Sequence, residues 1–114
     1  MGGKASREKG KIGERMACKA LGQVIGGEWR RSLVQSRRGA ELPDIICDDY
    51  PDLGVEVKRQ KRPSIPAALA QAINDCDGTS RIPLALCKPD RGIWTLTLRL
   101  EDLGALMQAL RDRG

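Results

Sequence analysis

The chain has 114 residues, enough for one small domain with a single core. Its 20 Lys and Arg outnumber its 15 Asp and Glu, and the resulting charge of +5 favours a polyanionic partner such as nucleic acid or an acidic membrane surface. The absence of histidine excludes catalysis by a Ser-His-Asp or Cys-His arrangement. An enzyme with this composition has to work with carboxylates, lysine and a metal.

No apolar run approaches the roughly 20 residues needed to span a bilayer. Residues 1–11 (MGGKASREKGK) also lack the apolar region of a signal peptide. We therefore expect a cytoplasmic protein with no membrane partner. The four cysteines form no C-x-x-C pair, and each lies in an apolar segment, so we predict buried free thiols: Cys18, Cys47, Cys76 and Cys87.

The first third of the chain predicts an arm, a helix and a strand. Residues 1–10 are basic and have no apolar period, which indicates a mobile basic arm. Apolar residues at helical spacing predict an amphipathic helix over residues 11–25, which Gly26 and Gly27 end. Residues 28–36 are typical of a strand, and residues 37–41 of a turn.

The remainder predicts a hairpin, a helix, two strands and a last helix. These elements cover residues 44–48, 54–59, 65–76, 82–87, 93–98 and 100–111. Ser64 and Pro66 are typical of the start of the second helix. The predicted order is α-β-β-β-α-β-β-α, which indicates one α/β domain over residues 1–114, with a mixed sheet flanked by helices.

The hairpin carries a cluster of charged side chains. A side-chain period of two places Glu56 and Lys58 on one face of their strand, while Val55 and Val57 face the other way. A turn near Pro51 would place Asp44 roughly opposite Lys58. We therefore expect the Asp44 and Glu56 carboxylates and the Lys58 ammonium to converge.

Converging carboxylates repel one another unless a cation neutralises them. Asp44 and Glu56 offer the oxygen ligands that Mg²⁺ or Mn²⁺ prefers, and the Val57 carbonyl is a further candidate ligand. A water activated there and oriented by Lys58 would be a nucleophile for a phosphodiester. The alternative is an exposed hairpin whose charges form ion pairs worth about 0 to 1 kcal/mol each.

Two helix residues are candidates for the same site. Glu14 lies at the edge of the apolar arc of the first helix, so its carboxylate can look along the core surface. Gln71 lies just beside the apolar stripe of helix 65–76, which we expect to carry Leu69, Ala70, Ile73 and Cys76. An ordinary exposed position explains Glu14 equally well.

The basic residues near this cluster match what DNA phosphates require, namely guanidinium forks and neutral donors. The candidate DNA contacts are Arg30, Arg31, Ser32, Ser36, Arg37, Arg38, Arg59, Lys61 and Arg62. Only Trp29, Tyr50 and Trp94 are aromatic, so base stacking is not the main source of affinity. We expect recognition by phosphate contacts and shape, with binding that weakens steeply with salt.

These motifs resemble the PD-(D/E)XK nuclease superfamily, and within it the archaeal-type Holliday junction resolvases and their small phage-encoded relatives. The resemblance rests on Pro43-Asp44, on Glu56-Val57-Lys58, on the preceding Glu14 and on the following Gln71. It extends over most of the chain, from Lys9–Arg15 to the I-P-L-A-L and I-W-T-L-T-L segments.

The resemblance implies a restriction-endonuclease-like core and a homodimeric, Mg²⁺-dependent endonuclease that cuts branched DNA. It assigns Asp44 and Glu56 as metal ligands, Glu14 as a further carboxylate at the metal and Lys58 as the catalytic lysine. It makes Gln71 a supporting pocket residue. Ser32 or Ser36 would occupy the place of a serine near the scissile phosphate.

Two alternatives stay open. The same superfamily includes nucleases for flaps, nicked DNA or duplex sites. In a different class, the chain would be a basic DNA-binding protein without catalysis. Acidic residues amid a basic surface disfavour this last alternative, because they weaken DNA binding.

Overall fold

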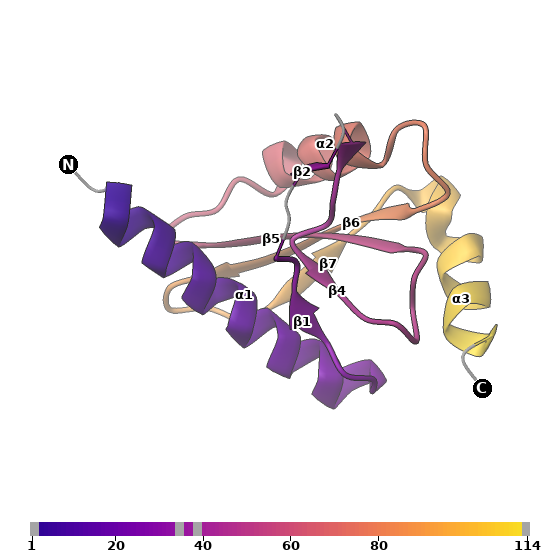
Figure 1. Ribbon diagram of the computed structural model, residues 1–114, viewed down its shortest axis with the longest axis horizontal. Coiled ribbons are helices and arrows are strands. Elements are labelled where there is room, and N and C mark those ends of the chain that lie inside the picture. The colour runs from indigo at the N-terminus through magenta and orange to yellow at the C-terminus, as the bar shows by residue number, and fades with distance from the viewer. Residues whose placement is uncertain (1–2, 34–35, 38–39, 113–114) are drawn as a thin grey trace.

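The structure, a computed structural model, describes residues 3–33, 36–37 and 40–112. Its elements in chain order are α1 (Gly3–Ile25), β1 (Arg30–Arg31), β2 (Ser36–Arg37), β3 (Ala40–Glu41), β4 (Ile45–Ile46), β5 (Leu53–Gln60), α2 (Ile65–Cys76), β6 (Ile82–Pro89), β7 (Thr95–Thr97), the 3-10 helix η1 (Leu100–Asp102) and α3 (Leu103–Asp112). Figure 1 shows the sheet between α1 and α2, with α3 near the end of the sheet that lies away from the N-terminus.

The main sheet has five strands in the order β1-β4-β5-β6-β7. β5 and β6 run parallel and the other neighbours are antiparallel, so the predicted mixed sheet flanked by helices is confirmed. The predicted three strands before the second helix were too few. Residues 28–41 contain the short β1 and a separate two-stranded sheet, β2-β3, where one strand and a turn were expected.

The two faces of β5 have different environments. Leu53, Val55 and Val57 are buried in the main core, together with Leu84 of β6 and Ala17 of α1. The full buried set of this core is Ala17, Leu21, Ile45, Cys47, Tyr50, Leu53, Val55, Val57, Ile82, Leu84, Leu86 and Leu106. Because strand side chains alternate, the residues between these on β5 point toward α2.

The opposite face of the sheet packs on α2 through small side chains. Ala68, Ala72 and Cys76 are the buried residues of α2, and Ala68 packs with Ala85 and Cys87 of β6. Of the expected stripe, Cys76 is buried, Leu69 and Ile73 are half-buried and only Ala70 is exposed. The centre of the buried side is formed by Ala68 and Ala72, whose small side chains allow the helix to lie close to the sheet. The predicted limits of the helix and its Ser64 cap are confirmed, since the Ser64 hydroxyl accepts from the Ala67 N–H at 3.2 Å.

Helix α1 begins at Gly3, so residues 3–10, where a mobile basic arm was expected, belong to the helix that was predicted to begin at residue 11. Residues 1–2 of that arm lie outside the described residues. The apolar period begins only where the helix reaches the sheet, which is why the pattern missed the first turns. Gly26 and Gly27 have φ values of 80° and 87° and end the helix as predicted.

The last helix covers the core only in part. Leu106 is buried, whereas Leu103 and Met107 of the expected stripe are 42% and 49% exposed. An apolar groove of about 200 Å³ remains between α1 and α3, lined in part by Val24 and Leu96. The prediction of a helix that closes the core is therefore only partly confirmed.

The four cysteines are free, as predicted, and three of them are buried, with Cys18 half-buried. Burial raises the pKa of the Cys18 thiol to about 11, which keeps it protonated and inert at neutral pH. Among the described residues, no helix combines the length and the apolar character that crossing a membrane requires.

Candidate active site

Asp44 is held at the start of the hairpin by backbone hydrogen bonds. Its N–H donates to the Val55 carbonyl, and its carbonyl accepts from the Ser32 N–H, both at 3.0 Å. The hairpin pairs Ile45 with Val55, so Asp44 lies beside Glu56 and Val57, not opposite Lys58 as the turn suggested. The Asp44 Oδ2 accepts from the Val57 N–H at 2.9 Å, which fixes the carboxylate at the edge of β5.

Glu56 is a buried acid on the α2 side of β5. Only 4% of it is exposed, and its Oε2 lies 3.6 Å from the Lys58 Nζ. Lys58 is about one third exposed, so its ammonium connects the buried carboxylate with the solvent side of the site. The predicted convergence of Glu56 and Lys58 on one face is confirmed.

Burial raises the pKa of both carboxyl groups. Desolvation, with the Asp44 charge as a second cause, raises the pKa of Glu56 to about 8 although Lys58 opposes the shift. Desolvation also raises the pKa of Asp44 to about 6, against the effect of the Val57 N–H. Two acids with raised pKa values in one place are typical of a functional site, because a stable fold alone has no need of them.

Glu14 reaches the site from α1, where it forms an ion pair with β1. The Arg31 Nε donates to the Glu14 Oε1 at 2.8 Å, and both side chains are largely buried. The negative charge of Glu14 also contributes to the raised pKa of Asp44. Arg31, which we predicted as a DNA contact, is therefore engaged with a carboxylate of the site.

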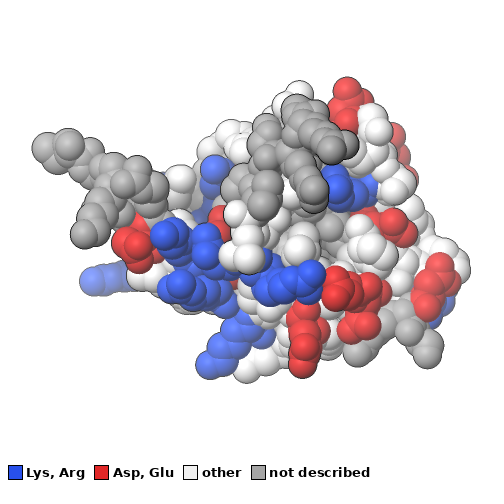
Figure 2. Space-filling model, viewed as in Figure 1, with Lys and Arg blue, Asp and Glu red and all other residues white. Residues whose placement is uncertain are grey.

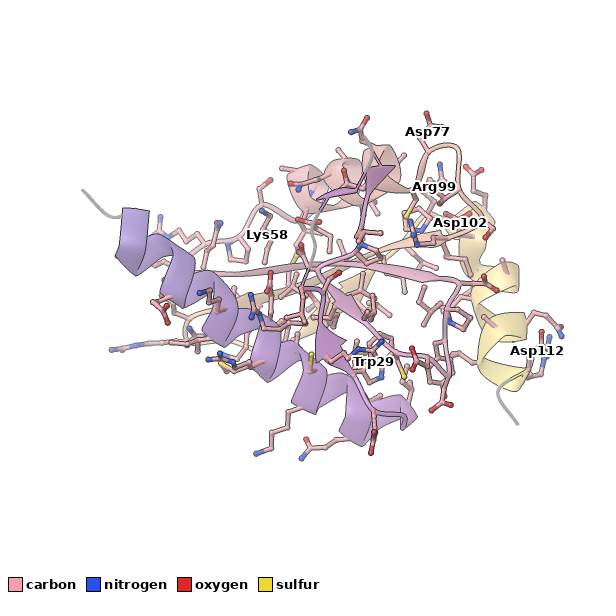
Figure 3. The ribbon with its side chains drawn as sticks, viewed as in Figure 1. Trp29, Lys58, Asp77, Arg99, Asp102 and Asp112 are labelled. Carbon is pink, nitrogen blue, oxygen red and sulfur yellow. The ribbon has the colours of Figure 1, made fainter. Side chains whose placement is uncertain are left out.

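One pocket of about 450 Å³ brings the predicted residues together. Its lining consists of Lys9, Gly10, Gly13, Glu14, Asp44, Glu56, Val57, Lys58, Arg59, Gln60 and Gln71. All five predicted catalytic residues and the predicted Val57 ligand are among them, although they come from α1, the start of the hairpin, β5 and α2. Figure 3 shows Lys58 in the region between α1 and α2.

The candidate DNA contacts are more dispersed. Arg30 forms an exposed ion pair with Asp48 at 3.1 Å, and Ser32 is only 4% exposed and lines a different pocket. Lys61 and Arg62 are exposed after β5. Ser36 and Arg37 form β2, and nothing is described of their side chains, while Arg38 lies outside the described residues. In Figure 2, Lys and Arg gather over α1 and toward β1, whereas Asp and Glu gather on the side of the β4–β5 turn.

Sequence reasoning missed several residues around the site. The negative charge of Asp75 helps to raise the pKa of both Asp44 and Glu56. Asp75 lies four residues after Gln71 on α2, and this helical spacing was a usable signal. Lys9, Gly10 and Gly13 were missed because the pocket extends along the part of α1 that we expected to be an arm or the plain start of a helix.

The donor set fits a hard divalent cation with few protein ligands. In the described ranges, no group of three or more acidic or cysteine side chains is arranged to hold a metal ion. Asp44 and Glu56 remain as a carboxylate pair, since Glu14 is bound to Arg31. Burial keeps the pKa values of this pair raised although Lys58 lowers both, and a bound cation would favour the charged carboxylates further. Mg²⁺ commonly uses one or two carboxylates and keeps several waters, so two ligands suffice.

Comparison of the chain with models of protein families, with curated proteins and with solved structures finds no match. The functional assignment therefore depends on the residues and on their geometry.

Proposed function

We propose that the protein is a Mg²⁺-dependent DNA endonuclease that hydrolyses phosphodiester bonds in branched DNA, most specifically in Holliday junctions. One observation carries the proposal. Glu14, Asp44, Glu56, Lys58 and Gln71, chosen from the sequence, line a single pocket although they come from four separate segments. An exposed hairpin with incidental charges would not bury Glu56 or raise the pKa of two acids.

Mg²⁺, with Mn²⁺ as a substitute, would be held by Asp44 and Glu56, and the Val57 carbonyl is a further candidate. When bound, it would neutralise the carboxylates and the substrate phosphate and activate the attacking water. Glu14 would join this set only after Arg31 releases it, because the two are joined at 2.8 Å.

The side chains of the chain itself account for the remaining roles. Lys58 lies 3.6 Å from Glu56 and is partly exposed, so its ammonium is suited to stabilise charge that develops on the scissile phosphate. The Val57 N–H holds the Asp44 carboxylate in a fixed orientation. Gln71 offers an amide donor and acceptor at the rim of the pocket.

Charge and composition support DNA as the substrate. The net charge is +5, and Arg59, Lys61 and Arg62 directly follow the catalytic strand segment. Two of the three aromatic side chains, Trp29 and Tyr50, stack on each other with ring centroids 5.9 Å apart, which leaves little for base stacking. Phosphate contacts and DNA shape then determine recognition, and a junction is a substrate defined by shape.

We propose that the protein acts as a homodimer, which would give a four-way junction two pockets. Exposed apolar side chains on α1 and α3 support this, since Val24, which lines the groove between these helices, is 79% exposed and Met107 of α3 is 49% exposed. Exposed apolar clusters of this kind are common at protein interfaces. Sedimentation equilibrium should give a dimer, and Met107→Glu should yield a monomer. A wild-type monomer contradicts the dimer.

The test of function is a Mg²⁺ titration with a synthetic four-way junction labelled on each strand. We expect paired nicks at symmetric positions that appear with Mg²⁺ or Mn²⁺ and disappear with EDTA. Cleavage confined to flapped, nicked or duplex DNA would instead identify a nuclease of different substrate preference. Binding without cleavage of any DNA would identify a non-catalytic DNA-binding protein and contradict the proposal.

A further inference from the structure

The pocket has a wall on the α1 side where the proposed function places no contact except Arg59, a candidate DNA contact whose position on the substrate it leaves open. Lys9, Gly10, Gly13 and Arg59 line this wall. Side-chain alternation along β5 directs Arg59 toward α1, whereas Glu56 and Lys58 point toward α2. The wall therefore faces away from Glu56 and Lys58 but belongs to the same pocket of about 450 Å³. This volume is many times the roughly 30 Å³ that one water occupies in the liquid.

Arg59 has a buried donor that no protein group satisfies. Its Nε is inaccessible to solvent and has no hydrogen-bond partner in the described part of the chain. The carboxylates nearby are engaged elsewhere, because Glu14 pairs with Arg31 and Glu56 lies beside Lys58. Buried N–H donors are almost always paired in proteins, so an arginine with this one unpaired is suited to turn its guanidinium toward a ligand with acceptor oxygens that enters the pocket.

The side chain of Arg59 is held in place by close packing against α1. A Cβ at Gly13 would lie 3.0 Å from the Arg59 Cβ and 3.7 Å from its Cδ, so the helix backbone closely approaches the stem of the arginine. An arginine whose stem is fixed in this way loses less conformational freedom when its guanidinium binds an anion.

On the same face of α1, one turn before Gly13, Gly10 has open space where a side chain would lie. A Cβ at Gly10 would meet no atom within 4 Å, although Gly10 lines the pocket. Glycine destabilises the interior of a helix, and no neighbouring atom requires so small a residue at position 10. Close approach of a ligand to the backbone does give a reason.

We propose that Arg59 donates to a DNA backbone phosphate that lies against α1 at Gly10, next to the phosphate that is cut. This inference rests on the proposed function and names Arg59 as the residue that positions its substrate. Arginine suits the role because its planar fork binds two phosphate oxygens. The positive charge that continues through Lys61 and Arg62 favours a phosphodiester chain over a neutral ligand.

Two pairs of matched variants test the proposal. Gly10→Leu places a side chain in the pocket, and its control Gly104→Leu changes a glycine of α3 whose Cβ would also meet nothing within 4 Å. Arg59→Gln removes the guanidinium, and its control Arg111→Gln removes an exposed charge on α3. Junction affinity is measured by fluorescence anisotropy in EDTA over a range of salt concentrations, with thermal unfolding of each variant as a check of the fold.

We expect Gly10→Leu and Arg59→Gln to bind the junction about tenfold more weakly than wild type, because each removes or blocks one charge-assisted phosphate contact. In Arg59→Gln the slope of log affinity against log salt should fall by about 1. Both controls should bind as wild type does. Gly10→Leu should unfold at or above the wild-type temperature, because leucine favours the helix.

Wild-type affinity and salt slope in both Arg59→Gln and Gly10→Leu would overturn the inference. If Gly10→Leu does not fold, Gly10→Ala replaces it, and wild-type binding by Gly10→Ala and Arg59→Gln has the same meaning. The assay contains no metal, so it is independent of catalysis. A wild-type protein that binds the junction but never cuts it contradicts the proposed nuclease, while the Arg59 comparison still decides this inference.

Discussion

The two sides of β5 carry opposite chemistry on one eight-residue strand. Toward α1, Leu53, Val55 and Val57 are at most 8% exposed and join the main core. Toward α2, Glu56 is 4% exposed, yet it is an acid whose pKa is raised to about 8. Both sides are buried to a similar degree, but only the first gains free energy from burial.

The apolar side of β5 therefore stabilises the fold, whereas burial of its acidic side costs free energy. Burying apolar area contributes about 25 cal/mol per Å², whereas burying a carboxylate without a counter-charge costs free energy. Lys58 compensates Glu56 only in part, since the pKa of Glu56 stays raised. The contrast predicts that changes on the two sides separate activity from stability.

The largest effects should come from the acidic side and appear in activity. Asp44→Asn, Glu56→Gln and Lys58→Ala should each lower the nicking rate by about 10²- to 10³-fold or more, because each removes a cation ligand or a stabilising charge. Single-turnover nicking of the junction measures the loss, and anisotropy should show that DNA binding persists. Glu101→Gln, an exposed acid far along the chain, is the matched control. Full activity in any of the three variants would remove that residue from the mechanism.

The apolar side should respond in stability. Leu84 lies opposite Val55 on β6 and is 2% exposed, so Leu84→Ala should destabilise the fold by roughly 2–5 kcal/mol. Urea unfolding measures this loss. The rate per folded molecule should stay near wild type. A Leu84→Ala protein that keeps full stability but loses activity would mean that the two sides are not separate.

A change of pH should reveal the cost of the acidic side directly. The pKa of Glu56 is about 8 in the folded protein and near 4.5 in the unfolded chain, so the folded state binds the extra proton between these values. Stability without metal should therefore fall as pH rises through this window. Relative to wild type, Glu56→Gln should gain on the order of 1–3 kcal/mol between pH 5 and pH 9. Parallel pH profiles in urea unfolding would contradict this cost.

The smallest effect concerns the spacing between α1 and β5. A Cβ at Gly13 would lie 3.0 Å from the Arg59 Cβ, so Gly13→Ala should shift α1 and cost roughly 1 kcal/mol despite the better helix propensity of alanine. Gly104→Ala lacks such a contact and should stabilise the protein slightly. Thermal unfolding compares the two, and equal gains in both would show that α1 is free to adjust.

The sequence predicted the parts of this protein that follow from local periodicity. The start of α2 agrees because Ser64 and Pro66 mark it, and β6 was recognisable as a continuous apolar run. The convergence of Glu56 with Lys58 follows from the two-residue period of a strand. Glu14 and Gln71 were also placed correctly at the pocket, since both lie at the edge of a helical stripe.

The remaining features depend on tertiary contacts that no local pattern encodes. The ion pair between Arg31 and Glu14 depends on how α1 crosses the sheet. The burial of Ala68 and Ala72 depends on how closely α2 can approach β6, and hydrophobicity alone ranks Leu69 and Ile73 above them. The pairing of Ile45 with Val55 depends on the turn geometry. It places Asp44 beside Val57, whereas the sequence had suggested a position opposite Lys58.

The central claim is that Asp44 and Glu56 form a binding site for a divalent cation. Calorimetric titration of the free protein with Mn²⁺ at pH 7, in two buffers of different ionisation enthalpy, tests it most directly. Because Glu56 is largely protonated at that pH, we predict binding with release of about one proton per ion, and loss of binding in Asp44→Asn. Absence of binding in wild type, or equal binding in Asp44→Asn, would contradict the claim.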